Sequence, residues 1–164
     1  MGLNAYLTLK GQKQGSINGS VTRKGHENSI LVHSFSNEII DPRDPASGLP
    51  TGKRQHEPVT IVKEVDQSSP KLWNALVDNE TLIAWELQFW SLDATLPDEE
   101  KQIYAISLTN ASIASMHQFM DDNQTPALAT LPLQEEISFT YQKIEWTWTD
   151  GGITATDDWE TPVS

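Results

Sequence analysis

The sequence has no cysteine, few positive charges and no long apolar segment. Without cysteine it has neither a disulfide framework nor a thiolate metal site, so its fold is indifferent to the redox state of its compartment. There are 11 Lys and Arg residues against 23 Asp and Glu, and the formal net charge of -12 repels nucleic-acid phosphates and anionic membrane surfaces. No stretch approaches the roughly 18 apolar residues that a membrane-spanning helix needs. Residues 1–30 also lack the apolar core of a signal peptide. We therefore expect no nucleic-acid binding, no membrane insertion and no cleaved signal peptide.

Period-two alternation of apolar and polar residues dominates the chain and predicts strands. The predicted strands cover residues 3–10, 19–23, 29–36, 58–65, 83–90, 104–109 with a continuation through Met116, 137–141 and 144–148. Turns or loops are expected at 97–100 and 120–132, and a bulge near Gln142-Lys143 would explain the change of register there. A length of 164 residues suits one domain. Many strands with little helix predict a mainly β fold, a single closed or nearly closed antiparallel barrel or sandwich.

One short helix is expected at about Pro70–Val77. Ser68 or Ser69 can cap its free backbone N–H groups, and proline suits the first helical position because it has no N–H to leave unsatisfied. The helix should end at Asp78-Asn79, since both residue types tolerate the left-handed conformation. Its apolar stripe consists of Leu72, Ala75 and Leu76. With only about two turns the helix is too short to be stable alone, so the stripe must dock on the sheet.

A long loop is expected at about Asn37–Glu57, where three prolines and two glycines interrupt any apolar periodicity. Loops of this length are usually functional or disordered. Lys53-Arg54 within it is the densest positive spot of an acidic chain. In a monomer the pair is an ordinary solvated turn. In a homo-oligomer it can meet the carboxylates of a neighbouring subunit, where the planar arginine fork provides bidentate geometry.

No residue pattern points to catalysis, a cofactor or a metal. The spacings of His33, His56 and His117 match no zinc-ligand pattern. Glu135-Glu136 and Asp121-Asp122 are adjacent pairs, and neighbours in a strand point to opposite faces, so neither pair can flank one glycosidic bond. No nucleophile motif or phosphate-binding glycine loop occurs. A hydrolase acting on cell wall is accordingly the least favoured of the three functional hypotheses considered for this sequence.

The six tryptophans leave open the hypothesis that the protein is a ligand-binding module. Buried aromatic side chains are ordinary in a β core, but exposed ones can form a platform on which sugars stack. The chain can therefore be a monomeric β-barrel module that binds carbohydrate or another ligand. The candidate platform residues are Trp85, Trp90, Trp146 and Trp148.

Two segments resemble a known family in order and spacing: TGKRQHEPVTIVKEVDQSSPKLWNAL at 51–76 and YQKIEWTWTDGG at 141–152. Together with NAYLTLKG near the start and Asp157-Asp158-Trp159 near the end, they make the chain similar to the hemolysin-coregulated protein (Hcp) family. Proteins of this family are the tube subunits of bacterial type VI secretion systems. The residues that carry the family motif here are Lys63, Asp66, Ser68, Ser69, Pro70, Leu72, Tyr141, Lys143, Ile144 and Trp146.

The resemblance implies one Hcp-like β-barrel domain over residues 1–164, with a flexible tail after about Trp159. It implies a non-enzymatic protein that forms hexameric rings, which stack into a tube ejected by a contractile sheath and tipped by a spike protein. The lumen would carry and protect effector proteins. The tube would assemble in the bacterial cytoplasm and then be secreted. The implied ring-stacking loop comprises Ser47, Gly48, Leu49, Pro50, Thr51, Gly52, Lys53 and Arg54.

Overall fold

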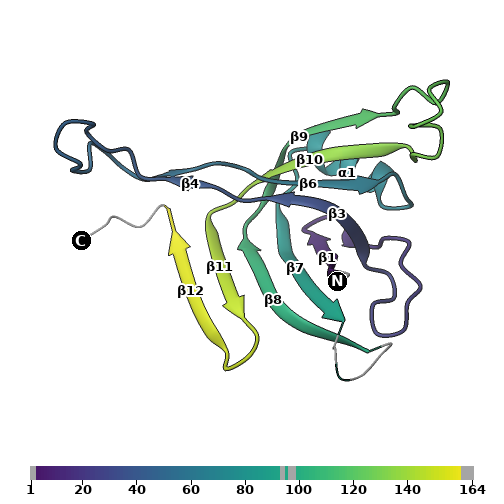
Figure 1. The fold of residues 1–164 in the computed structure, drawn as a ribbon, viewed down its shortest axis with the longest axis horizontal. Helices are drawn as coiled ribbons and strands as arrows, with labels where there is room; N and C mark the ends of the chain where they lie inside the picture. The colour runs from purple at the N-terminus through teal and green to yellow at the C-terminus, as the bar shows by residue number, and fades with distance from the viewer. Residues whose placement is uncertain (1–2, 93–94, 96–98, 160–164) are drawn as a thin grey trace.

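The computed structural model describes residues 3–92, 95 and 99–159, and their fold is mainly antiparallel β (Figure 1). One helix, α1 (Ser69–Val77), occurs in this part of the chain. The strands are β1 (Leu3–Gly11), β2 (Gly15–Ile17), β3 (Ile30–Ser36), β4 (Ile39–Ile40), β5 (Gln55–His56), β6 (Val59–Glu64), β7 (Leu82–Leu92), β8 (Glu100–Thr109), β9 (Ser112–Phe119), β10 (Gln134–Thr140), β11 (Lys143–Trp148) and β12 (Ile153–Asp158). The predicted turn at 97–100 and the tail after Trp159 fall largely or wholly outside the described residues.

Ten strands form one strongly curled sheet in the order β12-β11-β8-β7-β1-β3-β6-β10-β9, with β2 added to β1. Strand pairing does not close this sheet into a complete barrel, because within the described chain β12 lies at one end and β9 at the other. A backbone bridge between Leu82 and Ala111, with N–H to O distances of 2.8 and 3.2 Å, brings the start of β9 against the start of β7. The predicted antiparallel barrel or sandwich is confirmed: the structure is a barrel whose sheet is not closed by strand pairing.

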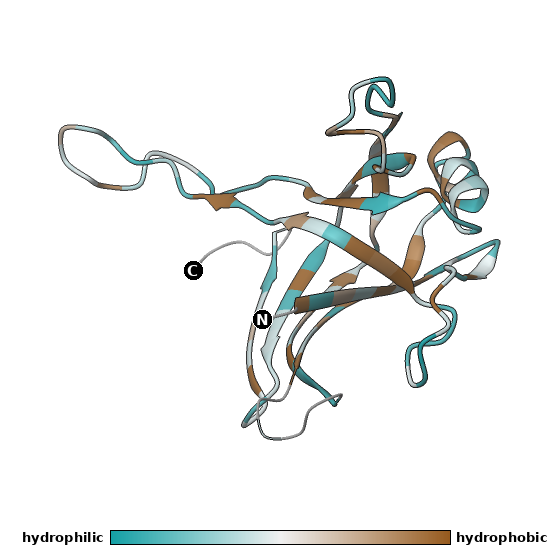
Figure 2. Cartoon of the chain, turned by 45° about the vertical axis from the view of Figure 1, so that its right-hand side comes forward, coloured by the Kyte–Doolittle hydropathy of each residue, from teal (hydrophilic) through white to brown (hydrophobic). Residues whose placement is uncertain are grey.

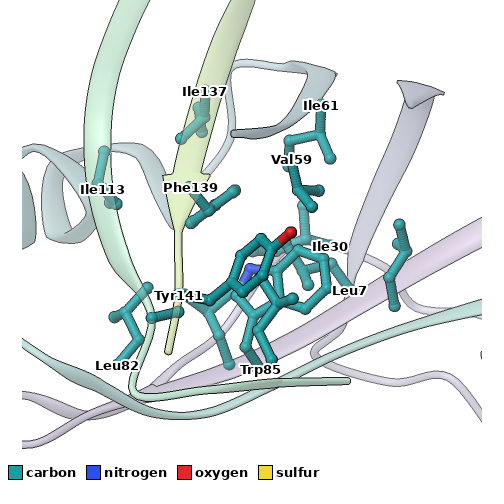
Figure 3. Close-up of a cluster of buried hydrophobic side chains, with 14 of the residues drawn as sticks. Leu7, Ile30, Val59, Ile61, Leu82, Trp85, Ile113, Ile137, Phe139 and Tyr141 are labelled. Atoms are coloured by element: carbon teal, nitrogen blue, oxygen red, sulfur yellow. The ribbon is translucent and has the colours of Figure 1, made fainter. Parts of the chain in front are cut away.

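The inner faces of the strands meet in one apolar core. Figure 3 shows Leu7 of β1, Ile61 of β6 and Trp85 of β7 among the side chains of this core, all of them buried. The Trp85 and Phe139 rings pack edge to face, with centroids 5.4 Å apart. Figure 2 shows apolar and polar residues mixed along the strands, and in β6 Val59 and Ile61 are buried whereas Thr60 and Val62 between and after them are only partly buried. The alternation that predicted the strands therefore also identified the side that faces the core.

α1 begins one residue before the predicted start and docks on the barrel through Leu72 and Ala75, both buried. It ends as predicted at Asp78, and Asn79 follows in the left-handed conformation with φ of 50°. Asparagine is among the few residues other than glycine that adopt this conformation readily.

Two strand predictions need correction. Residues 19–23 are not a strand: they belong to a loop that folds back on itself, in which the Gly19 N–H donates to the Asn28 carbonyl at 2.9 Å. The change of register near 142 is a corner and not a bulge. β10 pairs with β6 and β9, whereas β11 pairs with β8 and β12, so the chain crosses here from one part of the barrel to another.

The predicted long loop is a hairpin that projects from the barrel, as Figures 1 and 2 show. We call residues 37–57 the arm. Ile39 pairs with His56 and Ile40 with Gln55, so β4 and β5 form a small sheet of their own. The sequence missed them because two-residue strands carry no alternation. β12 was also missed: most of its side chains are exposed, and it shows no buried face.

Gly19 has to be glycine because backbone lies against it. A Cβ there would come within 2.6 Å of Ile30 Cγ1 and 2.7 Å of Ile30 Cα, and closer still to the Ser29 carbonyl oxygen. We expect Gly19→Ala to lower the free energy of unfolding by about 1–3 kcal/mol, the usual cost of overpacking. Gly52→Ala is the matched control, since its Cβ would enter open space. Urea denaturation of both variants checks this, and equal stability of the two would contradict it.

Candidate functional site

Lys63 of β6 is completely buried together with Glu135 of β10. Lys63 Nζ donates to Glu135 Oε1 at 2.5 Å, to Asp66 Oδ1 at 3.1 Å and to the Glu64 carbonyl at 2.9 Å. The other carboxylate oxygen of Glu135 accepts from Gln118 Nε2 of β9 at 2.9 Å. A buried charge is tolerated only when its partners surround it in this way. The network joins three neighbouring strands below α1.

The same network holds the start of the helix. Ser69 Oγ donates to Glu135 Oε1 at 2.7 Å and accepts the Asp66 N–H at 3.0 Å. Asp66 Oδ1 in turn accepts the Ser68 N–H at 2.9 Å. The prediction that Ser68 or Ser69 caps the helix is wrong, because Ser68 occupies the cap position without a side-chain cap bond. Both hydroxyls are used instead by the Lys63 network and its Asp66 neighbour.

A second polar cluster joins the arm to the barrel. Arg54 of the arm holds Asp157 of β12 with two bonds, Nε to Oδ2 at 2.5 Å and Nη2 to Oδ1 at 2.8 Å. His56 lies between Asp157 and Tyr141, with Nε2 2.7 Å from Asp157 Oδ2 and Nδ1 2.8 Å from the Tyr141 hydroxyl. We call Arg54, His56, Tyr141 and Asp157 the Asp157 cluster. It connects residues about a hundred positions apart.

Charge and burial shift the pKa values of three members of this cluster, Asp157, Arg54 and Tyr141. The hydrogen bonds from Arg54, with a further contribution from His56, hold the pKa of Asp157 below its usual value despite partial burial. The Asp157 bond likewise raises the pKa of Arg54. Burial raises the pKa of Tyr141 to about 12, so its hydroxyl keeps its proton at neutral pH. The Asp157 carboxylate can only accept, so His56 Nε2 donates to it.

The predicted stacking residues lie at the outer part of the arm and along its returning side. Asp44 closes the tip: its carbonyl accepts the Gly48 N–H at 2.7 Å and its Oδ2 accepts from Ser47 Oγ at 2.9 Å. Leu49 projects there with 65% of its surface exposed. The structure separates the predicted basic pair. Lys53 is exposed, whereas Arg54 is held by this chain's own carboxylates and is no solvated turn residue.

The second motif segment supports the base of the arm. Ile144 is in the core, and Trp146 Nε1 donates to Asn37 Oδ1, the first arm residue, at 2.9 Å. Lys143 pairs along the backbone with Asp158 and Thr109. The motif residues are thus brought together in two structural groups, one under the helix and one at the arm. Sequence reasoning missed the roles of Asn37 and Asp157. For Asp157 the available signal was the acidic pair Asp157-Asp158 that precedes Trp159.

The four candidate tryptophans do not form a common platform. Trp85 is 2% exposed, and Trp146 is tied to the arm. Trp90 donates to Gln88 Oε1 at 3.1 Å and meets the His26 ring edge-on. Trp148 is the one of the four that projects from the surface, with 47% exposed. These positions argue against the carbohydrate-binding alternative, because stacked sugars need adjacent exposed rings.

The candidate histidines also lie apart. His33 Nε2 lies 3.7 Å from Glu64 Oε1, His56 belongs to the Asp157 cluster, and the His117 ring stacks on Phe119. In the described ranges no group of three His, Cys, Asp or Glu side chains is placed to hold a metal ion. Nor does that part of the chain contain a helix long and apolar enough to span a membrane.

Residues 6–148 match the family described as type VI secretion system effector, Hcp. The chain belongs to the Hcp family. The match covers most of the barrel, both motif groups and the arm, and it confirms the resemblance seen in the sequence. Hcp is a family of secretion-system proteins and not a known family of enzymes.

Individual relatives agree with this assignment. The Major exported protein of Pseudomonas aeruginosa is 37% identical, over 100% of this chain and 99% of that protein. A double mutant of Hcp1 from Escherichia coli EAEC 042 superposes with a TM-score of 0.84 at 30% identity, over 96% of this chain and 99% of the other. The secreted protein Hcp3 of Pseudomonas aeruginosa gives a TM-score of 0.77 at 29% identity, over 98% and 100%.

The buried ion pair of this Hcp protein should dominate its stability. We expect Lys63→Met to lower the free energy of unfolding by about 3–5 kcal/mol, because it leaves the Glu135 carboxylate buried without its cation. Adding Glu135→Leu should recover part of the loss. Lys53→Met, at an exposed position, is the control. Urea denaturation measures all three, and a loss below about 1 kcal/mol for Lys63→Met would refute this account.

The Asp157 cluster should respond to acid. A carboxylate whose pKa is lowered by folding stabilises the native state above its ordinary pKa, and this contribution disappears as pH falls through the lowered value. The stability difference between the wild type and Asp157→Asn should therefore be largest near neutral pH and vanish in strong acid. Denaturation at a series of pH values measures it. A difference that stays constant down to about pH 2 would show that the Asp157 charge is not responsible.

Proposed function

We propose that this Hcp protein is the structural subunit of the inner tube of a type VI secretion system. Identical subunits form hexameric rings, and the rings stack into a tube that a contractile sheath ejects. Each subunit is a single Hcp-like domain. The observation that carries the proposal is the arm: a hairpin tied to the barrel at its base, with an exposed tip reaching away from it (Figure 1).

Ring formation needs a head-to-tail contact that is repeated until it closes. The barrel offers a surface for it along β12, which has β11 as its strand neighbour and ends the sheet. Ile153 of β12 is 67% exposed and pairs with the exposed Trp148 of β11. An open strand edge beside exposed apolar side chains favours contact with a second copy, because isolated edges are otherwise prone to uncontrolled pairing.

Stacking is the function we propose for the arm residues Ser47 to Arg54. Lys53 can meet the carboxylates of a neighbouring ring, since the subunits are strongly acidic. Leu49 adds an apolar contact at the tip. Arg54 acts differently, because it holds the arm to its own subunit.

The channel of the tube would carry and protect effector proteins, and sheath and spike proteins would be its other partners. The tube assembles in the bacterial cytoplasm and is then secreted. The names of the relatives support export: one is an exported protein and another a secreted one. The net charge of -12 per subunit favours soluble rings and attracts basic cargo.

Electron microscopy of the pure protein tests the proposal. We expect rings with a central opening in negative stain, a hexamer by light scattering, and tubes at high concentration and low salt. Leu49→Ala combined with Lys53→Glu should shorten the tubes several-fold while leaving single rings intact. Val77→Ala combined with Lys71→Glu, the same change at exposed positions of α1, is the control. A protein that stays monomeric under all these conditions would overturn the tube assignment.

A further inference from the structure

The arm has few internal means of holding a direction. Its strands β4 and β5 are two residues long, and a two-stranded hairpin is marginal in water without packing against other elements. Ile39 is only partly buried and Ile40 is exposed, so the arm contributes nothing to the buried core. Its orientation must therefore come from contacts at its base.

Side-chain hydrogen bonds reach both sides of that base. On the outgoing side, Asn37 accepts from Trp146. On the returning side, Arg54 and His56 converge on Asp157, and Arg54 Nη2 also donates to the Asp158 carbonyl at 3.1 Å. A bidentate guanidinium–carboxylate pair fixes the relative plane of its two groups as well as their separation. These bonds attach the base of the arm to the barrel on both of its sides.

The strand that receives these bonds, β12, is one of the two ends of the sheet in the described part of the chain. Asp157 and Asp158 pair with Ile144 and Lys143 of β11, and the Trp159 N–H donates to the Gln142 carbonyl at 3.2 Å. β12 is therefore attached to the barrel on one side and to the arm at its C-terminal end. A contact that orders β12 also acts on the arm.

We infer that Arg54, His56 and Asp157 are positioning residues that hold the arm in its stacking orientation and couple it to lateral contact at β12. The inference rests on the proposed tube function, and it assigns to these residues a role separate from that of the exposed tip. Coupling of this kind is reciprocal: a neighbour bound at β12 stabilises the arm, and a docked arm stabilises the lateral contact.

Three variants separate geometry from charge. Asp157→Asn removes the shared carboxylate, and Arg54→Lys keeps the positive charge but loses the bidentate fork. Asp150→Asn is the matched control, with the same change of charge at an exposed position in the turn between β11 and β12. We expect the first two variants to form rings only at a several-fold higher protein concentration than the wild type, because the undocked arm no longer supports the lateral contact, and to form tubes several-fold shorter. Asp150→Asn should leave tube length unchanged.

Hydrogen exchange provides a second readout that does not depend on assembly. The amides of Asp44, Gly48 and Thr51 are bonded within the arm. We expect them to exchange several-fold faster in Asp157→Asn and Arg54→Lys, and core amides such as those of β1 to be unchanged. Ring closure in the wild type should slow the same arm amides, because it orders β12.

The possible results distinguish the positioning role of the Asp157 cluster from a general effect on the fold and from failure of the proposed tube. Tubes of wild-type length in both Asp157→Asn and Arg54→Lys would overturn the positioning role, and so would arm amides that exchange at the wild-type rate. General loss of core protection in both variants would show that the cluster holds the whole fold and not the arm. A wild type that never forms rings would overturn the proposed tube, whereas faster arm exchange in the variants would still support the positioning role of the Asp157 cluster.

Discussion

The buried pair of Lys63 and Glu135 is the constraint on which the rest of this structure depends. Two opposite charges inside an apolar core are stable only if every remaining donor and acceptor is satisfied. Here that requirement brings β6, β9 and β10 together and places the first turn of α1 against them through Ser69. The family motif around the helix is thus explained by folding. Its polar members surround one buried ammonium group: Asp66 and Ser69 contact Lys63 Nζ, and Ser68 bonds to Asp66.

The Asp157 cluster uses the same chemistry closer to the surface. It links the arm to the last strand through bonds that need correct angles as well as correct charges. An apolar contact would hold the arm without fixing its direction, since the hydrophobic effect is non-directional. For the ring-forming subunit that we propose, the direction of such a contact is the property that matters. A small angular error repeated around a ring prevents its closure.

Sequence patterns predicted the strands that have one buried face, as in β1 and β7, because a buried face imposes alternation. The helix was predicted from Pro70 and the Asp78-Asn79 end, and both signals were correct. The pattern failed for β12, whose side chains are mostly exposed, and for the corner at Gln142, where a change of register resembles a bulge. Capping was misassigned because Ser68 and Ser69 suit both a helix cap and a buried network.

By itself, the sequence determined the mainly β fold class, the single helix, the position of the long arm and the membership of the Hcp family. Each of these follows from a local feature of the sequence, which is alternation, a set of turn residues or a contiguous motif. Only the tertiary structure decided that Arg54 belongs to its own subunit's Asp157, that Lys63 is buried, and that the sheet stays open at β12. These facts depend on which distant residues become neighbours, and charge or polarity along a chain does not specify its partner.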